Sequence, residues 1–244
     1  AAFKNKPFMF GALMYLATWM AIVVIESNLQ FFILHILQRQ AQNIIIMVGI
    51  FVTAIVSLPI WNWVSKNWNK RLAYIIGVGF WAVVMLVLIM MSPETPFWLI
   101  MVFCVMAGVG VSAGQVLPWA IIPDAIEWEE YHTGERNEGM FYSLVTLLGK
   151  IGMAIAQPLS LLILQFTHFK EGQGVVQPAS ALLGIRLVVG PIPALFLITG
   201  ILIAIFYPLD RKQHREIVEE LRNRRLERKA GRAGKRPLPG VKEG

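Results

Sequence analysis

Three ionisable side chains lie within long apolar stretches of the sequence, and they are the first candidates for chemistry. Lys150 lies in SLVTLLGKIGMAIAQP, Glu26 in IVVIESNLQFF and Arg186 in ALLGIRLVV. A charge at the centre of a membrane-spanning helix costs at least about 2.5–3.5 kcal/mol, so such a residue is retained for a reason, such as contact with an ion or a polar solute. These residues therefore indicate recognition of charge inside a membrane.

Lys150 is the deepest of the three. It lies about 11 residues into a predicted helix over 139–166, or roughly 16 Å along its axis, which is the depth of the bilayer midplane. We expect it to face a polar cavity or an acidic partner; the alternative is a structural ion pair between helices. Gln115, at a similar depth in the preceding predicted helix, either contacts a polar group of a substrate or hydrogen-bonds to another helix.

Glu26 and Asn28 belong to a polar cluster that interrupts an apolar helix. We expect them to line a pathway or to mark a local break in the helix; a further alternative for Glu26 is a vestibule carboxylate without a role in transport. Glu26 lies roughly 28 Å along its helix, nearer the opposite end, so we expect no direct contact with Lys150. Arg186 lies near a helix end, where its long side chain reaches the interface as an anchor.

Six apolar stretches must position these residues. The 244 residues are 56% hydrophobic and only 15% charged, against about 25% charged in soluble domains. A span needs about 20 apolar residues, and we predict six, at about 7–37, 44–63, 72–91, 97–122, 139–166 and 179–207. They predict an all-α integral membrane bundle over 1–209, in which Gly110 and Gly114 mark a close approach between helices.

The basic residues gather on one side of the predicted membrane. The tail, 210–244, carries 12 Lys and Arg against 6 Asp and Glu, which accounts for 6 of the 7 net positive charges. Lys66, Lys70, Arg71 and Arg136 fall in links on the same side. By the positive-inside rule, the termini are cytoplasmic and the protein is a multi-pass protein of an inner or plasma membrane.

The tail is predicted to begin as a short helix with Ile217 and Leu221 on one face. Its expected partner is a surface of anionic membrane lipids rather than nucleic acid. The alternative is a simple solvated tail.

The sequence gives little support for an enzyme. Cys104 is the only cysteine, and the four histidines are scattered: His35, His132, His168 and His214. They form no nucleophile–base set and no metal-ligand spacing. We therefore expect no catalytic residue, no metal site and no cofactor.

The segment VLPWAIIPDAIEWEEYHTGERNEGMFYS resembles the end of the tenth helix in the glycoside–pentoside–hexuronide cation symporters, a group of major facilitator transporters. The resemblance covers nearly the whole chain, as helices seven to twelve of a twelve-helix protein. PIWNWVSKNWNKR and ALLGIRLVVGPIPALF are similar to further segments of the group. VIESN, LPIWNW, LPWAIIPD and YPLD are most similar to its sodium-dependent lysophosphatidylcholine symporter branch, and ALLGIRLVV to its melibiose-permease branch.

The resemblance implies roles for individual residues. Lys150 matches a lysine that borders the cation and substrate sites, and Glu26 matches a glutamate of helix seven. Gln115 stands near the place where the melibiose branch carries a substrate-stacking aromatic, which argues against a galactoside bound in the same way. Asp124 and Arg136 match charged residues of the inner face, where a pair that forms in one state and separates in another acts as a gate. The alternative is a solvated acidic loop.

The resemblance also implies a function. We expect the C-terminal half of a sodium- or proton-coupled symporter for a lysolipid, a glycoside or a similar amphiphilic solute. The acidic residues that bind the coupling cation in this group belong to its N-terminal half, so a complete pathway needs that half or a second copy of this chain. The alternative is a non-transporting scaffold or accessory subunit of a larger membrane complex.

Overall fold

The computed structural model describes residues 5–170, 172 and 175–233, and the elements of this part of the chain are helices. Six helical stretches are long and apolar enough to cross a membrane, which confirms the predicted all-α membrane bundle. In chain order the elements are α1 (Lys6–Phe31), the π-helical turn η2 (Phe32–Ile36), the 3-10 turn η3 (Gln40–Gln42), α2 (Asn43–Asn67), α3 (Lys70–Leu88), α4 (Phe97–Thr133), α5 (Glu138–Phe166), α6 (Ala179–Val189), α7 (Pro191–Ile205) and α8 (Arg211–Ala233).

The fourth span is longer than expected. We predicted its end near residue 122, before an acidic link, but α4 continues to Thr133 and stops at Gly134, which has φ 74°. Glycine adopts this left-handed conformation without steric cost and commonly ends helices. Pro118 and Pro123 lie inside α4, so proline was a poor guide to its end.

The sixth span is broken into α6 and α7 at Gly190. Pro191 follows the break and has no N–H to donate, which favours a new helix start there. A Cβ atom on Gly190 would overlap Ile89 at the end of α3, so glycine permits this close approach. Arg186 donates a hydrogen bond to the Ile89 carbonyl, which joins α6 to the end of α3.

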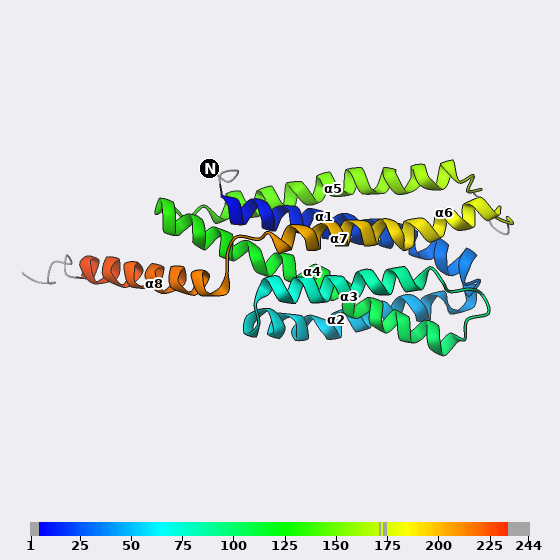
Figure 1. Ribbon diagram of the computed structural model, residues 1–244, viewed down its shortest axis with the longest axis horizontal. Helices are drawn as coiled ribbons and strands as arrows, with labels where there is room; N and C mark the ends of the chain where they lie inside the picture. Colours follow the sequence, from blue (N-terminus) through cyan, green and yellow to red (C-terminus); the bar gives the residue numbers. More distant parts are fainter. Residues whose placement is uncertain (1–4, 171, 173–174, 234–244) are drawn as a thin grey trace, which may run out of the picture.

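The helices are arranged around α1, which lies between α4 and α5 and also packs against α7 (Figure 1). α3 packs against α4 and α7, and α2 packs on the outer side of α4. α8 contacts α4 and extends away from the membrane-spanning bundle, at the end where the N-terminus lies (Figure 1). We call this the terminal end of the bundle.

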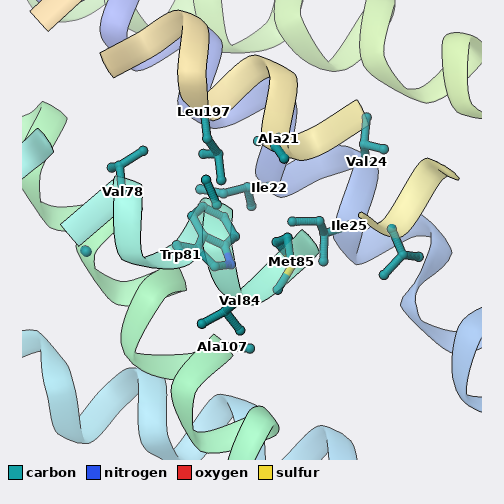
Figure 2. Packing of buried hydrophobic residues seen from close by; sticks show 14 of the residues in the cluster. Ala21, Ile22, Val24, Ile25, Val78, Trp81, Val84, Met85, Ala107 and Leu197 are labelled. Carbon is teal, nitrogen blue, oxygen red and sulfur yellow. The ribbon is translucent and has the colours of Figure 1, made fainter. Parts of the chain in front are cut away.

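Trp81 of α3 fills the centre of the core and is fully buried. Figure 2 shows its ring among Ile22 of α1, Leu197 of α7 and residues of its own helix. A Cβ on Gly110 would lie 2.5 Å from Trp81 Cβ, and one on Gly114 would lie 2.9 Å from Trp81 Cζ3. The two glycines therefore let α4 approach α3 closely, as their spacing predicts.

Candidate functional site

Lys150 lies on an exposed part of α5, beside two glycines that fit tightly against α1. A Cβ on Gly149 would lie 2.8 Å from the Tyr15 hydroxyl, and one on Gly152 would lie 3.0 Å from Leu16 Cδ1. Among the described residues, the Lys150 ammonium has no ion-pair or hydrogen-bond partner. The described helices therefore offer no interhelical ion pair that would explain this lysine.

Gln115 is exposed on α4 at nearly the same depth as Lys150. A Cβ on its neighbour Gly114 would lie 3.0 Å from Thr18 of α1, whereas Gly149 of α5 faces Tyr15. Tyr15 and Thr18 are separated by only about 4.5 Å along the axis of α1. Since α1 lies between α4 and α5, Gln115 and Lys150 lie at about the same depth along the bundle axis, which we call the level of Lys150 and Gln115.

Aromatic rings connect α1, α4 and α5 beside this level. Tyr15 and Trp19 of α1 stack with ring centroids 5.8 Å apart, and Trp119 of α4 meets Tyr15 edge-on at 5.3 Å. Tyr142 of α5 stacks on Trp119 at 6.3 Å. Trp119 is 39% exposed and Tyr142 is 38% exposed, so these rings form a partly open surface, which we call the aromatic wall.

Glu26 and Asn28 do not share a surface. Glu26 is exposed, whereas Asn28 is buried and its side-chain amide donates to the Val24 carbonyl at 2.7 Å. Helix positions two apart point in different directions, so the expectation that both line one face is wrong for Asn28. Glu26 lies about 16 Å along α1 from Tyr15, in agreement with the predicted separation from Lys150.

Asp124 is buried within α4 at the terminal end of the bundle, not in a link as predicted. Lys70 Nζ lies 2.6 Å from Asp124 Oδ1 and also donates to the Ala120 carbonyl at 2.9 Å. His214 Nε2 of α8 lies 3.3 Å from Asp124 Oδ1 and 2.8 Å from Glu127 Oε2. These charges join α3, α4 and α8.

Arg136 belongs to a different set of ion pairs. It pairs with Glu130 at 2.9 Å and with Glu138, and Arg225 of α8 also pairs with Glu130 at 2.6 Å. The structure therefore does not join Asp124 to Arg136, because each has partners nearer to it. The alternative of a solvated acidic loop is wrong for Asp124, which is only 6% exposed.

Sequence reasoning missed the partners Lys70, Glu127 and His214. Asp124 and Glu127 are three apart, and such positions lie on one helix face, but the signal was lost because this segment was predicted as a link. The donor atoms of Asp124, Glu127 and His214 lie within 4.8 Å of one another, a spacing that a metal ion could use. Lys70 already neutralises Asp124, so we interpret the set as a helix-docking cluster.

The predicted apolar face of the tail is confirmed. Ile217 is 9% exposed and Leu221 is 4% exposed, and both belong to the main hydrophobic core. Arg224 lies over the Tyr131 ring with 4.9 Å to its centroid and donates to the Tyr131 carbonyl at 3.2 Å. α8 is thus a packed part of the terminal end, while the predicted tail beyond Ala233 lies outside the described residues.

A family model described as MFS/sugar transport protein matches residues 1–211. The chain belongs to this family. It is 34% identical over 236 residues to an uncharacterized symporter of Synechocystis sp., a match that covers 91% of this chain and 42% of the relative. It is 30% identical over 213 residues to sodium-dependent lysophosphatidylcholine symporter 1-A of Danio rerio, covering 86% of this chain and 39% of the relative.

A third relative is a sphingosine-1-phosphate transporter of Xenopus tropicalis, 28% identical over 200 residues, with 80% of this chain and 38% of the relative covered. The chain thus spans about two fifths of the length of these curated relatives. Membership of the MFS/sugar transport family confirms the resemblance to major facilitator symporters. It makes the chain part of an integral multi-pass membrane transporter family and points to transport, not catalysis.

Proposed function

We propose that this chain forms the C-terminal half of a sodium- or proton-coupled symporter for an amphiphilic solute such as a lysolipid or a glycoside. In this proposal the solute passes along the surface formed by α1, α4 and α5, and a second half supplies the opposite wall. Two relatives support the choice of solute, because lysophosphatidylcholine and sphingosine-1-phosphate are both amphiphilic molecules with a phosphate group.

The observation that carries the proposal is the unpaired Lys150 in the middle of α5. An ammonium group at this depth needs a counter-charge or water, because its desolvation is costly. The described helices supply neither an acidic partner nor a hydrogen-bond acceptor for it. In this proposal the ammonium faces the water-filled pathway, where an acidic residue of the second half or an anionic group of the solute supplies its counter-charge.

The aromatic wall suits the apolar part of such a solute. Indole and phenol rings combine a large apolar face with a polar tip, and Trp119 and Tyr142 expose part of theirs next to the level of Lys150 and Gln115. Glu26, farther along α1, is an exposed carboxylate that a cationic group or a coupling cation meets on the same route.

We also propose that the terminal end is cytoplasmic and contains the gate of the symporter, with Asp124 and Arg136 as members. Glu130 supports this role because it already binds two arginines, Arg136 and Arg225, and shared ion pairs are suited to exchange between states.

The orientation is tested by labelling the opposite end of the bundle. A thiol introduced at the exposed His168, in a protein that also carries Cys104→Ala, should react with a membrane-impermeant maleimide in intact cells. If the thiol at position 168 reacts only after the cells are lysed, then that end of the bundle is cytoplasmic and the proposed orientation is wrong.

The function is tested by uptake of radiolabelled lysophosphatidylcholine and of a labelled glycoside into liposomes that contain the native protein. We expect uptake to depend on a sodium or proton gradient and to fall at least about tenfold in Lys150→Ala, which corresponds to about 1.4 kcal/mol. Lys170→Ala is the matched control, because Lys170 lies between α5 and α6 and, among the described residues, forms hydrogen bonds through its backbone alone. Full gradient-dependent uptake by Lys150→Ala would refute the mechanism, and no uptake by the native protein would favour the scaffold alternative.

A further inference from the structure

Helix α8 contacts the bundle through α4, and one histidine takes part in this contact. Figure 1 shows that α8 follows α7 after a short link and extends away from the membrane-spanning helices. Ile217 and Leu221 supply buried apolar contacts, and Arg225 pairs with Glu130 at 2.6 Å. His214, in the first turn of α8, places its imidazole beside two carboxylates of α4. The docking of α8 therefore combines apolar contacts, which do not respond to pH, with charges that can.

One nitrogen of the His214 ring lies close to both carboxylates. Nε2 is 2.8 Å from Glu127 Oε2 and 3.3 Å from Asp124 Oδ1, so Glu127 is the main hydrogen-bond acceptor. A ring nitrogen that faces carboxylates must carry a hydrogen, and both ring nitrogens carry one in the imidazolium form. Asp124 is buried, and His214 and Glu127 are partly buried, so water screens these charges weakly. The geometry therefore favours the protonated ring.

Protonation of His214 balances the charges of this cluster. Asp124 and Glu127 carry two negative charges, and Lys70, whose ammonium lies 2.6 Å from Asp124 Oδ1, carries one positive charge. The imidazolium of His214 supplies the second positive charge. When the ring loses its proton, the four side chains keep one negative charge in excess, and a charge-assisted hydrogen bond to Glu127 becomes a neutral donor's bond, which is about half as strong. Loss of the proton therefore weakens the attachment of α8 to α4.

The neighbouring titratable groups do not replace this charge. Among the described side chains, three further groups face the cluster, namely Arg136, Tyr207 and Asp210. Arg136 is already paired with Glu130 and Glu138, and Asp210 brings a negative charge. Arginine and lysine stay charged and tyrosine stays neutral up to about pH 10, whereas histidine ordinarily changes its charge between about pH 5 and pH 8. His214 is therefore the group whose charge changes near neutral pH.

The other histidines are placed differently. His132 is exposed near the end of α4, where its ring stacks on Trp128 with centroids 3.9 Å apart and Nδ1 lies 2.8 Å from the Trp128 carbonyl. His35 and His168 lie at the opposite end of the bundle. In the part of the chain that the structure describes, the ion pairs of histidine with carboxylates are those of His214. His132 is therefore a matched control on the helix that α8 contacts.

We propose that His214 is a pH-sensitive latch for α8, whose imidazolium form holds the helix on α4 and whose neutral form loosens it. Because the docked state favours the protonated ring, docking weakens as the pH rises through the titration of His214. The latch does not require that the chain transports a solute. With the terminal end in the cytoplasm, a consequence that rests on the orientation proposed above, the position of α8 beside Asp124 and Glu130 responds to the cytoplasmic pH.

The test is amide hydrogen exchange of α8 in the native full-length protein, measured between about pH 6 and about pH 9, across the titration of histidine and above that of ordinary carboxylates. Each exchange rate is divided by that of an unprotected amide at the same pH, which removes the direct effect of pH. An isolated helix is marginally stable in water, so the protection of α8 reports its docking. We expect this protection to fall about tenfold over the range, as a charge-assisted bond becomes neutral. Protection that stays constant would overturn the proposal.

Three variants assign the response to one side chain. His214→Lys keeps a positive charge throughout, because lysine ordinarily loses its proton near pH 10.4, so its α8 protection should not change with pH. His214→Gln is neutral and should be about tenfold less protected than the native protein near pH 6, again without a pH response. His132→Gln should keep the native response. A native-like fall in protection in His214→Lys, or loss of the response in His132→Gln, would overturn the assignment to His214 even if His214→Gln does not fold.

Discussion

Replacing Gly110 with alanine should loosen the contact between α3 and α4. The new Cβ would lie 2.5 Å from Trp81 Cβ and Cγ and 2.6 Å from Cδ1, whereas carbon atoms in contact prefer about 3.5–4.0 Å. Trp81 is fully buried and cannot move aside without displacing its neighbours. The helices must therefore separate by about 1 Å, the difference between these distances.

The cost follows from two opposing effects. Overpacking of a core typically costs about 1–3 kcal/mol, while alanine gains about 0.5–1 kcal/mol over glycine in a helix. We expect a net loss of about 1–2 kcal/mol from these terms. For a domain of this size, such a loss lowers the unfolding temperature by roughly 2–8 °C.

The measurement is thermal unfolding of the purified native protein in one detergent, with Gly139→Ala as the matched control. A Cβ on Gly139 would meet no atom within 4 Å, so this substitution should leave the unfolding temperature unchanged or raise it. An unfolding temperature of Gly110→Ala equal to that of Gly139→Ala would refute the reasoning, because the tight contact with Trp81 would then carry no energy.

Two further predictions concern the terminal end. Lys70→Ala removes the ammonium from the Asp124 carboxylate, whose side chain is only 9% exposed. The carboxylate keeps His214 as a neighbour, and the loss of its bond to Lys70 should cost about 1–3 kcal/mol. Adding Asp124→Asn should recover part of the lost thermal stability. Leu221→Ala removes a buried contact of α8 with the bundle and should cost about 2 kcal/mol or more, which would appear as faster amide hydrogen exchange in α8.

Each of these variants has a control nearby in the sequence, Lys66 at the end of α2 for Lys70 and Leu226 of α8 for Leu221. Lys66→Ala removes an exposed lysine and should not change stability, and Leu226→Ala removes a leucine that is 56% exposed. If Lys70→Ala is as stable as Lys66→Ala, the prediction is wrong, because water then replaces the bond between Lys70 and Asp124 without loss of stability. If Leu221→Ala and Leu226→Ala exchange alike, then α8 is not held by its apolar face.

Hydrophobic run length was sufficient to predict the six spans, because a bilayer fixes how long an apolar helix must be. It did not predict where α4 ends or that the last span breaks at Gly190. Both depend on local packing, since the acidic end of α4 is covered by α8 and Gly190 fits against Ile89. Charged residues and prolines therefore predict a helix end only where no neighbouring helix packs on that segment and stabilises it.

Some residues of the candidate site could be predicted from the sequence and others could not, because contacts between helices are not visible in one segment. Lys150, Glu26 and Gln115 were found because a polar residue in an apolar run is conspicuous, and each is exposed in the structure. Asn28 was grouped with them by its place in the sequence, although helix geometry turns it into the core. The aromatic wall went unnoticed because three helices contribute to it, and no one segment shows the cluster.

Because α1 lies at the centre of the bundle, part of its surface stays uncovered until the last span has been synthesised. Gly200 of α7 packs close to Ala17 of α1 and against Tyr74 of α3, so the last span covers a surface made by the first. At about 5–20 residues per second, the ribosome needs roughly 8–32 s to synthesise the residues between α1 and α7. During that interval this face of α1 lacks the cover that α7 provides, so a chain that stalls before α7 presents it as a site for quality control.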